Sequence, residues 1–553
     1  MFVLVALLAC SGPAARVSAP TIPMADGVRL AADVVLPVAT TPERVPVVLI
    51  QTRYWRSFQL KFSQAPGAIP IGPRDDVVPA LVAAGYGVVV LDVRGTGASE
   101  GAWPRPWSAQ EVADMGAVID WIVAQPWSDG TVGTYGVSYE GTTAMLAATQ
   151  HRPALKAVLA REIEWDLVDE LIAPGGVRNT VFVDGWGRSV AALDRGAWPE
   201  LFPAGPGWIV NGPRRTDDDP EGTALAARLA ARPVPTVAAQ VERVRAPDDP
   251  FGEGGPAARA VGPAGWEPDL ATSTAAIGLW GSWWDGGTAD AVLRADAAVH
   301  LVDARIGPWV HEGDATASPL ARGHEEAIPL ADVVAFFDAH LRATTPAAPR
   351  RWYVAGEERW AEAPSWPSGA PWAWSLTPDH QLVAADTSPP PGAVGALDVD
   401  FAATNGPDTR WTAGLLHPLP APDRRDMPGL LSFATGPLGA PLEAFGSPTF
   451  RCQVSAENAP DSPAPEVALH AYLEAVEADG SVRLLTEGVL RTGTAPVELR
   501  LRPVGFALAA TEGLRLSIAG ADAGTFERVP ASGPARIGLA APCTLEVPGR
   551  GGG

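Results

Sequence analysis

Between residues 28 and 160 the sequence alternates between short apolar runs and segments with helical periodicity. Continuous apolar runs are typical of parallel strands that are buried on both faces of a sheet. Because strands that alternate with helices form parallel sheets, this pattern predicts a doubly wound α/β architecture. We expect strands in VRLAADVVL (28–36), VPVVLI (45–50), GYGVVVLDVRG (85–95), TVGTYGVS (131–138) and KAVLA (156–160).

Helices are expected between these runs, at 76–84, after Ser108 and over 142–150. Ser108 and Glu111 have the spacing of a capping box, in which a serine and a glutamate satisfy backbone N–H groups at a helix start. The apolar residues that follow recur at helical spacing.

The α/β pattern is then interrupted. Residues 161–270 are rich in Trp, Pro, Arg and acidic residues, and their short helical stretches predict a helical cap inserted into the α/β domain. The strand pattern resumes with AAIGLW (275–280) and VHLVDARIG (299–307), and a helix is expected at 329–342. We therefore predict an α/β domain over 20–160 and 271–345.

From about residue 350 onward, short alternating segments are separated by Gly and Pro. Examples are VALHAYLEAV, SVRLLTEGVLR, PVELRLRPV and GLRLSIAG. Such segments, divided by turn residues, are typical of a β-sandwich. We predict an all-β domain over residues 346–553.

The stretch GTYGVSYEG (133–141) places a serine between an expected strand and an expected helix, the setting that a nucleophile elbow requires. Gly136 and Ser138 fit the pattern G-x-S-x-G, but Glu140 occupies the place of the second glycine, which follows at Gly141. Ser138 is the candidate nucleophile, and a turn that merely contains serine is the alternative. Glu140 either occupies the first helical turn, where negative charge is favoured, or helps to shape the site.

Two later strands are each followed by a polar residue in a glycine-flanked loop. Asp285 follows AAIGLW, and His311 follows VHLVDARIG. The chain order Ser, Asp, His is that of α/β-hydrolase triads, with His311 as the base and Asp285 as its orienting carboxylate. The alternatives are an Asx-turn residue at 285 and a surface histidine at 311. His324 is the main rival base, and His300 fits less well because it opens a strand.

An oxyanion hole needs two hydrogen-bond donors. The backbone N–H of Tyr139, directly after the serine, is the expected first donor. The loop QTRYWRSF (51–58) has no glycine-rich stretch to supply a second N–H, but the phenol of Tyr54 can donate. The alternative is that Tyr54 packs against Trp55 as an aromatic lid.

Charge and composition exclude some classes of function. The formal net charge is −22, and no basic stripe interrupts it, so the chain repels phosphate backbones and nucleic-acid binding is not expected. No CxxC or HExxH motif occurs, and we expect neither metal nor cofactor.

The N-terminus begins with an apolar run over residues 2–9 that is too short to span a bilayer but has the length of a signal-peptide core. Leu7-Leu8-Ala9-Cys10 resembles a lipoprotein cleavage site with Cys10 as the lipidated residue, although a positive n-region is missing. We predict a signal or lipoprotein-type segment over 1–19 and export to the cell envelope or beyond, with a lipid anchor to the membrane if Cys10 is modified. If the segment is not a signal, the protein is cytoplasmic.

Two further cysteines, Cys452 and Cys543, lie in the predicted β-domain. In an exported protein they can form a disulfide. The alternative is two buried free thiols.

Together these motifs resemble the CocE/NonD hydrolases, a family that includes cocaine esterase, α-amino-acid ester hydrolases and X-Pro dipeptidyl-peptidases. The resemblance covers nearly the whole chain and rests on DGVRLAADVVLP, TRYW, GYGVVVLDVRGTGASEG, WIVAQPWSDGTVGTYGVSYEG, GSWWDGG and GPWVHEG. It implies an α/β-hydrolase domain with a helical cap and a C-terminal jelly-roll domain. The family motif G-x-S-Y-x-G matches residues 136–141, and the family's acid, base and tyrosine oxyanion donor map onto Asp285, His311 and Tyr54.

The expected activity is that of a serine hydrolase, which cleaves small-molecule esters or amides through an acyl-enzyme. The alternatives are an X-Pro dipeptidyl-peptidase and an α-amino-acid ester hydrolase or β-lactam acylase. Members of the ester hydrolase subgroup share SYEG and bind the substrate ammonium with carboxylates, which Asp166, Asp169 and Glu170 could supply here unless they are solvated helix charges. A non-catalytic envelope binding protein is a remote alternative.

Overall fold

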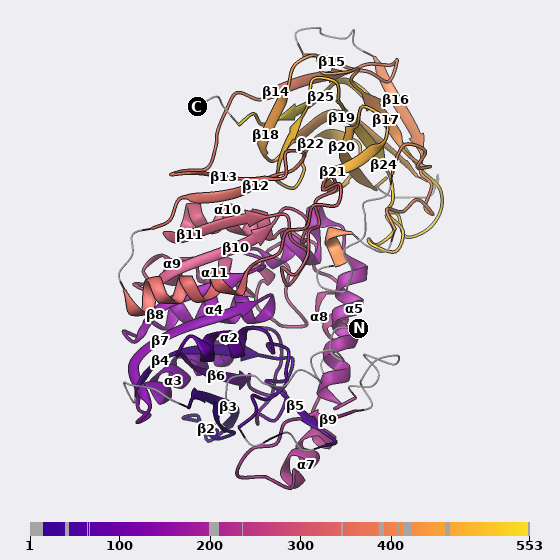
Figure 1. The fold of residues 1–553 in the computed structure, drawn as a ribbon. Coiled ribbons are helices and arrows are strands. Elements are labelled where there is room, and N and C mark those ends of the chain that lie inside the picture. The colour runs from indigo at the N-terminus through magenta and orange to yellow at the C-terminus, as the bar shows by residue number, and fades with distance from the viewer. Residues whose placement is uncertain are drawn as a thin grey trace.

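The computed structural model describes residues 15–550 except 39–43, 63–64, 66, 198–208, 235, 344–346, 386–391, 407–408, 413–422 and 459–464. Figure 1 shows two bodies: a large sheet with helices on both faces, and a C-terminal body built of strands. Cys10 and most of the predicted signal segment lie outside the described residues. No helix in the described part of the chain is long and apolar enough to cross a membrane.

The large sheet has the strand order β1-β3-β6-β4-β7-β8-β10-β11-β12-β13, with β2 paired to β3. Its central strands, from β6 to β12, run parallel to one another. They are β6 (Gly87–Asp92), β4 (Val45–Thr52), β7 (Ser128–Val137), β8 (Leu155–Arg161), β10 (Ala276–Ser282), β11 (Leu301–Gly307) and β12 (Arg350–Val354). The antiparallel edge strands are β1 (Ala15–Ser18), β2 (Thr21–Pro23), β3 (Arg29–Pro37) and β13 (Arg359–Ala363).

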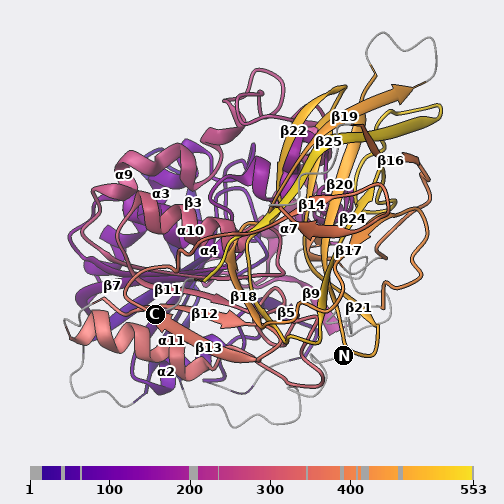
Figure 2. The same cartoon turned by 90° about the horizontal axis from the view of Figure 1, so that it is seen from above.

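Helices cover both faces of this sheet, which explains the continuous apolar runs. In β6, Val88 and Val90 pack on one face, whereas Val89 and Leu91 pack on the other. The first face is covered by α2 (Val77–Ala83) and α11 (Leu330–Phe337), and the second by α3 (Ala109–Val123), α4 (Tyr139–Ala147) and α10 (Thr288–Ala298). Figure 2 shows α2 and α11 on the side opposite α3 and α10. A strand between two layers of helices has no solvent-facing side, so both sets of its side chains are apolar.

The segment between β8 and β10 contains the helices that were expected there. They are α5 (Thr180–Asp194), α7 (Thr223–Ala231), α8 (Val237–Val241) and α9 (Glu267–Ala271), with short turns at Val168–Ile172, Pro174–Gly176, Ala258–Ala260 and Pro263–Trp266. The segment also holds a strand that the prediction missed, β9 (Val210–Pro213), which pairs with β5 (Phe58–Leu60). Both strands are too short to carry a periodic pattern in the sequence.

Three strands lie on unexpected sides of the predicted domain limits. β1 falls within the predicted signal segment, yet it pairs with β3 at the edge of the large sheet, so residues 15–18 belong to the α/β domain. β12 and β13 fall within the predicted β-domain, yet they continue the large sheet beyond β11. Short edge strands look alike in either kind of sheet, and only their pairing partners decide to which one they belong.

The C-terminal strands form a six-stranded sheet (order β15-β14-β25-β19-β22, with β16 on β25), a four-stranded sheet (β17-β24-β20-β21) and the pair β18-β23. They enclose one apolar core. Their bounds are β14 (Trp372–Leu376), β15 (Leu382–Ala384), β16 (Ala393–Asp398), β17 (Leu431–Ala434), β18 (Leu442–Gly446), β19 (Thr449–Asn458), β20 (Val467–Val476), β21 (Val482–Thr492), β22 (Ala495–Arg500), β23 (Val504–Leu508), β24 (Gly513–Ala519) and β25 (Ala535–Val547).

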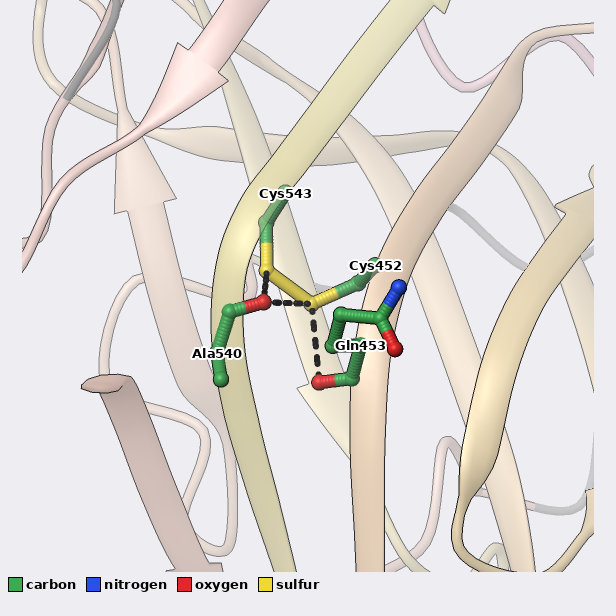
Figure 3. The surroundings of a disulfide bond; sticks show 4 residues. All are labelled: Cys452, Gln453, Ala540 and Cys543. Atoms are coloured by element: carbon green, nitrogen blue, oxygen red, sulfur yellow. Dashed lines mark hydrogen bonds between the residues drawn. A yellow bond between two sulfur atoms is a disulfide. The ribbon is translucent and has the colours of Figure 1, made fainter. Parts of the chain in front are cut away.

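A disulfide joins Cys452 of β19 to Cys543 of β25 (Figure 3). The two strands pair antiparallel, and their register shifts between Arg451 and Gln453, next to the bridge. Of the two alternatives that the sequence left open for these cysteines, the structure contains the bridged one.

Candidate active site

A cavity lies where the carboxyl ends of the parallel strands meet the segment between β8 and β10. This is the edge of an α/β sheet at which ligands bind. Its polar lining residues are Ser138, His311, Glu164 and the two tyrosines Tyr54 and Tyr139. The rest of the lining is apolar and comes largely from the inserted segment: Pro106, Trp107, Leu167, Leu171, Ile172, Phe182, Val183, Trp186, Val237, Val241 and Phe251.

Ser138 sits on a strained turn between β7 and α4. Its φ is 62° and its ψ −127°, a conformation that non-glycine residues seldom adopt and that costs about 1–3 kcal/mol. The Ser138 N–H donates to the carbonyl of Arg161 at 3.0 Å, which ties the turn to the end of the neighbouring strand β8. Strain of this kind is typical of functional residues that a surrounding structure holds in place.

The glycines around Ser138 are required by close backbone contacts. A Cβ atom at Gly136 would lie 2.1 Å from the carbonyl carbon of Glu140, and one at Gly141 would lie 2.6 Å from the carbonyl oxygen of Arg161. The second glycine of the elbow therefore stands at 141 because that is where α4 passes the end of β8. Position 140 is free to carry a side chain.

Glu140 links the serine helix to the histidine loop. Its carboxylate is fully buried and forms an ion pair with Arg74 Nε. Arg74 Nη1 in turn lies 2.5 Å from Glu312 Oε2, and Glu312 directly follows His311. Burial raises the pKa of Glu140, and the Arg74 guanidinium opposes that shift. Glu140 thus does more than occupy the first turn of α4: it belongs to a bridge between two of the candidate site's loops.

His311 and Asp285 are in direct contact. His311 Nδ1 lies 2.8 Å from Asp285 Oδ2, in loops that follow the adjacent strands β11 and β10. The Asp285 loop is fixed by the Gly286 N–H, which donates to the carbonyl of Arg410 at 2.8 Å. Burial disfavours the charged imidazole, but the nearby carboxylates, Asp285 first, outweigh it and raise the pKa of His311 to about 10.

The two rival histidines lie elsewhere. His324 is exposed, contacts Glu326 at 3.4 Å and does not line the cavity. His300 is exposed just before β11 and is likewise outside the cavity lining. Of the three candidate histidines in the sequence, only His311 shares a cavity with Ser138.

The hydroxyl of Tyr54 is held by a residue that the sequence did not reveal. Trp186 of α5 donates its indole N–H to Tyr54 Oη at 2.9 Å. The end of the same helix anchors the preceding residue, because Asp194 pairs with Arg53 at 2.9 Å. Burial raises the pKa of Tyr54 to about 12, so the phenol keeps its proton at neutral pH. Tyr54 also packs beside the cluster that contains Trp55, and it lines the cavity.

Tyr139 contributes through its backbone and its side chain. As the first residue of α4, its N–H has no acceptor within the helix. Its phenol donates to Glu111 Oε1 at 2.6 Å and accepts from Trp103 at 3.0 Å. Burial raises the pKa of Glu111 to about 8. Ser108 caps α3 as predicted by accepting from the Glu111 N–H at 3.3 Å, while the Glu111 carboxylate supports Tyr139.

Two buried carboxylates beside His311 were also missed. Glu162 Oε2 lies 4.0 Å from His311 Nδ1, and Glu164 lines the cavity. Burial raises the pKa of Glu162 to about 7 and that of Glu164 to about 8. The sequence held a usable signal, because REIEW directly follows the strand KAVLA and so lies at the carboxyl edge of the sheet.

The three carboxylates considered for ammonium binding lie beside arginines of the protein. Asp169 pairs with Arg294 at 2.8 Å, and Arg294 also lies 3.3 Å from Glu170 and 3.9 Å from Asp166. A second arginine, Arg502, contacts Asp169 at 3.4 Å. None of the three acidic residues is among those that line the cavity. That interpretation of Asp166, Asp169 and Glu170 is therefore wrong: their partners are arginines of the protein itself.

One set of side chains in the described part of the chain brings metal-ligand atoms within 4.8 Å of one another, namely Glu162, Asp285 and His311. The same atoms form the histidine–carboxylate contacts described above. A histidine whose ring nitrogen faces carboxylates is the arrangement of an acid–base group.

Residues 26–313 match the family model of the X-Pro dipeptidyl-peptidases (S15 family), and residues 343–543 match that of the X-Pro dipeptidyl-peptidase C-terminal non-catalytic domain. A Mycobacterium bovis protein assigned as a serine esterase is 30% identical and aligns over 94% of this chain and 92% of its own. The cocaine esterase of Rhodococcus sp. is 28% identical over 85% of this chain and 82% of its own.

A solved α-amino acid ester hydrolase has the same fold, with a TM-score of 0.70 over 98% of both chains at 21% identity. The fold is accordingly a CocE/NonD-like α/β-hydrolase fold with a C-terminal all-β domain. The chain belongs to the X-Pro dipeptidyl-peptidase (S15) family and is a serine hydrolase of the CocE/NonD type.

Proposed function

We propose that this protein hydrolyses carboxylic esters of small molecules through an acyl-enzyme formed on Ser138. One observation carries the proposal: the strained Ser138 shares a cavity with His311, whose Nδ1 is bound by Asp285 at 2.8 Å. A nucleophile, a base and a carboxylate that orients the base are the three parts that acyl transfer by serine requires.

The reaction follows from these positions. Because Asp285 holds Nδ1, His311 presents Nε2 to the serine and takes the Oγ proton as Oγ attacks the acyl carbon. The imidazolium then passes this proton to the leaving alcohol, and the acyl group stays on Ser138. A water molecule, deprotonated by His311, attacks the acyl-enzyme, and His311 returns this proton to Ser138 Oγ as the acid is released.

Tyr54 and the backbone N–H of Tyr139 form the proposed oxyanion hole. The indole N–H of Trp186 can only donate, so the oxygen of Tyr54 is the acceptor in that 2.9 Å contact. The phenol proton is then left free to bind the negatively charged oxygen of the tetrahedral intermediate. Such donors act strongly because they are already oriented before charge develops.

The substrate binds against an apolar wall. We assign the segment between β8 and β10, which was predicted at 161–270, as a cap over the cavity, because Phe182, Trp186, Val237 and Phe251 of this segment line it. An apolar acyl or alcohol group fits this lining. We assign the strands from β14 to β25 as a jelly-roll domain on the basis of their two packed sheets.

Export is part of the proposal. The apolar N-terminal run supports a signal segment, and the Cys452–Cys543 bridge suits an oxidising compartment. Cell fractionation with an antibody to the protein, together with mass analysis of a Cys10→Ser variant, tests export and lipidation separately. A fully cytoplasmic protein without a lipid would contradict both.

Glu164 favours a second candidate function, the hydrolysis of substrates that carry a free amine. It is a buried carboxylate in a cavity whose lining is mostly apolar, and an ammonium group would offset the cost of its burial. On this alternative the chain would act as a dipeptidyl-peptidase or an α-amino-acid ester hydrolase and would cleave amides as well as esters.

A substrate panel tests the proposal and separates the two candidates. p-Nitrophenyl butyrate, phenylglycine methyl ester and Gly-Pro-p-nitroanilide are compared at equal concentrations, with Ser138→Ala as the control. The proposed esterase hydrolyses the butyrate fastest. Faster turnover of the amine substrates, lost on Glu164→Gln, would establish the alternative instead. Equal activity of wild type and Ser138→Ala on every ester would overturn both.

A further inference from the structure

Glu162 is a buried carboxylate at His311 that the proposed mechanism does not use. It is the first residue after β8 and has a φ of 51°, which few residues other than glycine adopt. Its N–H donates to the carbonyl of Trp280 at 2.7 Å, and the Glu312 N–H donates to its Oε2 at 2.5 Å. Its backbone is thus held from β10, and its carboxylate from the His311 loop.

Two carboxylates therefore flank one imidazole nitrogen. Asp285 Oδ2 lies 2.8 Å from His311 Nδ1, and Glu162 Oε2 lies 4.0 Å from the same atom. The three side chains come from the ends of β8, β10 and β11, which are neighbours in the sheet. A second carboxylate at this distance adds to the attraction for a charged imidazole without competing for the hydrogen bond.

Glu312, Arg74 and Arg161, three other charged residues around His311, have partners of their own. Glu312 pairs with Arg74 at 2.5 Å, and Arg161 donates to the Glu312 carbonyl at 2.5 Å. Arg161 Nη2 also forms an ion pair with Glu162 Oε1 at 3.6 Å, a longer contact than its 2.5 Å hydrogen bond to the Glu312 carbonyl. The charged groups that face His311 from the packed elements are Asp285, Glu162, Glu164, Glu312, Arg74 and Arg161.

We propose that Glu162 is a second positioning residue for His311, which stabilises the imidazolium together with Asp285 and takes over part of that role when Asp285 is removed. The inference rests on the proposed function, in which His311 accepts the Ser138 proton. The proton moves from Ser138 Oγ to His311 Nε2, and the positive charge that results on the ring faces both carboxylates. Neither carboxylate gains a proton in this step.

A double-mutant cycle tests this inference. kcat/KM for p-nitrophenyl butyrate is measured in wild type, Glu162→Gln, Asp285→Ala and the double variant. We expect the loss caused by Glu162→Gln to be at least about tenfold larger when Asp285 is absent than when it is present. Gln keeps an oxygen that can accept from the Glu312 N–H. If Glu162 had only a structural role, Glu162→Gln would lower kcat/KM by the same factor with and without Asp285. Equal factors would therefore overturn the inference.

Glu474→Gln is the matched control for the cycle. Glu474 is an equally buried carboxylate, and its partners Arg424, Arg515 and Ser517 all lie in the β-domain. Glu474→Gln should change kcat/KM by the same factor whether Asp285 is present or replaced by Ala. Coupling as large as that of Glu162 would show that the cycle reports general destabilisation, and the inference would fail.

The pH profile of the single variant Glu162→Gln gives a second readout, which stands even if the Asp285 variants fold poorly. Because His311 must be neutral to accept a proton, the acid limb of kcat/KM follows its pKa. Removing one carboxylate should move that limb to lower pH, by about half a unit or more. An unmoved limb would contradict the inference. If Ser138→Ala were fully active, the proposed function itself would fail. If Ser138→Ala is inactive but the effects of Glu162→Gln and Asp285→Ala are simply additive, only this inference fails.

Discussion

His311 and His470 are both shielded from solvent, one in the α/β domain and one in the β-domain, and their surroundings shift their pKa values in opposite directions. Burial alone lowers the pKa of His470 to about 3. At His311 burial acts the same way, but the carboxylates of Asp285 and Glu162 outweigh it and raise the pKa to about 10. Burial alone thus keeps a histidine neutral, whereas carboxylates that face a buried histidine stabilise its protonated form.

Buried acids show the same contrast. Glu474 in the β-domain accepts from two arginines and a serine, so its charge is fully compensated. Burial raises the pKa of both Glu162 and Glu164 at the carboxyl edge of the large sheet, and Glu162 has its nearest arginine nitrogen at 3.6 Å. Glu162 and Glu164 are thus perturbed beside the candidate site, whereas Glu474 belongs to a satisfied network of the β-domain.

The largest expected effect comes from replacing one of the two histidines, and the other histidine serves as the comparison. His311→Ala should lower kcat for p-nitrophenyl butyrate by about 10⁵–10⁶-fold, because the general base is lost. His470→Leu should leave kcat near the wild-type value, because its ring packs among Tyr472 and Phe526, far along the chain from the cavity residues. Steady-state kinetics of both purified variants check this prediction. Comparable losses of kcat in the two variants would contradict the difference between the two histidines.

Tyr54→Phe is expected to have the next largest effect. Removing one oxyanion donor should lower kcat by about 10²–10³-fold with little change in KM, because the phenol binds charge that develops only in the transition state. The measurement is kcat and KM for an ester with an activated leaving group. A rise in KM at constant kcat would instead make Tyr54 a packing residue of the cavity wall.

Trp186→Phe should have a smaller effect through Tyr54. Loss of the indole N–H leaves the Tyr54 oxygen without that donor, which should lower kcat by roughly 2–10-fold. The loss should vanish in a Tyr54→Phe background, because the hydroxyl that Trp186 orients is then absent. An undiminished loss in that background would show that Trp186 acts only by packing.

Stability should depend on pH differently through the two histidines. The pKa of His470 is lower in the folded than in the unfolded chain, where it is about 6.5, so its contribution is present above that value and is lost as the pH falls toward 3. The pKa of His311 is raised, so its contribution is present below about 6.5 and is lost as the pH rises toward 10.

Thermal midpoints at pH 5, 7 and 9 test these signs. Relative to wild type, His470→Leu should lose less stability on acidification, and His311→Ala should lose less on alkalinisation. Parallel profiles for all three proteins would contradict the opposite pKa shifts.

Local sequence patterns predicted the parts of the candidate site that lie directly after strands. Ser138, Asp285 and His311 each follow a continuous apolar run, and the rule that ligand sites lie at the carboxyl ends of parallel strands drew attention to them. The same rule applied to REIEW would have included Glu162 and Glu164. The short strands β1, β9, β12 and β13 were missed or placed in the wrong body, because their short segments show no period that distinguishes one sheet from another.

Contacts between segments that are far apart in the chain could not be predicted from the sequence. Trp186 reaches Tyr54 only because α5 lies over the loop after β4, and Arg74 joins Glu140 to Glu312 only because three loops converge. No residue spacing along the chain indicates that these side chains are in contact. Buried side chains of this kind become visible only when the packing of the insertion against the sheet is known.

The most direct test is to identify the residue that becomes acylated. The protein is incubated with a fluorophosphonate, digested, and analysed by mass spectrometry, with Ser138→Ala treated in parallel. We predict a single adduct on the peptide that contains Ser138, complete loss of ester hydrolysis with labelling, and no adduct in the variant. An active protein that carries the adduct on another residue, or that hydrolyses esters at the wild-type rate without Ser138, would contradict the account.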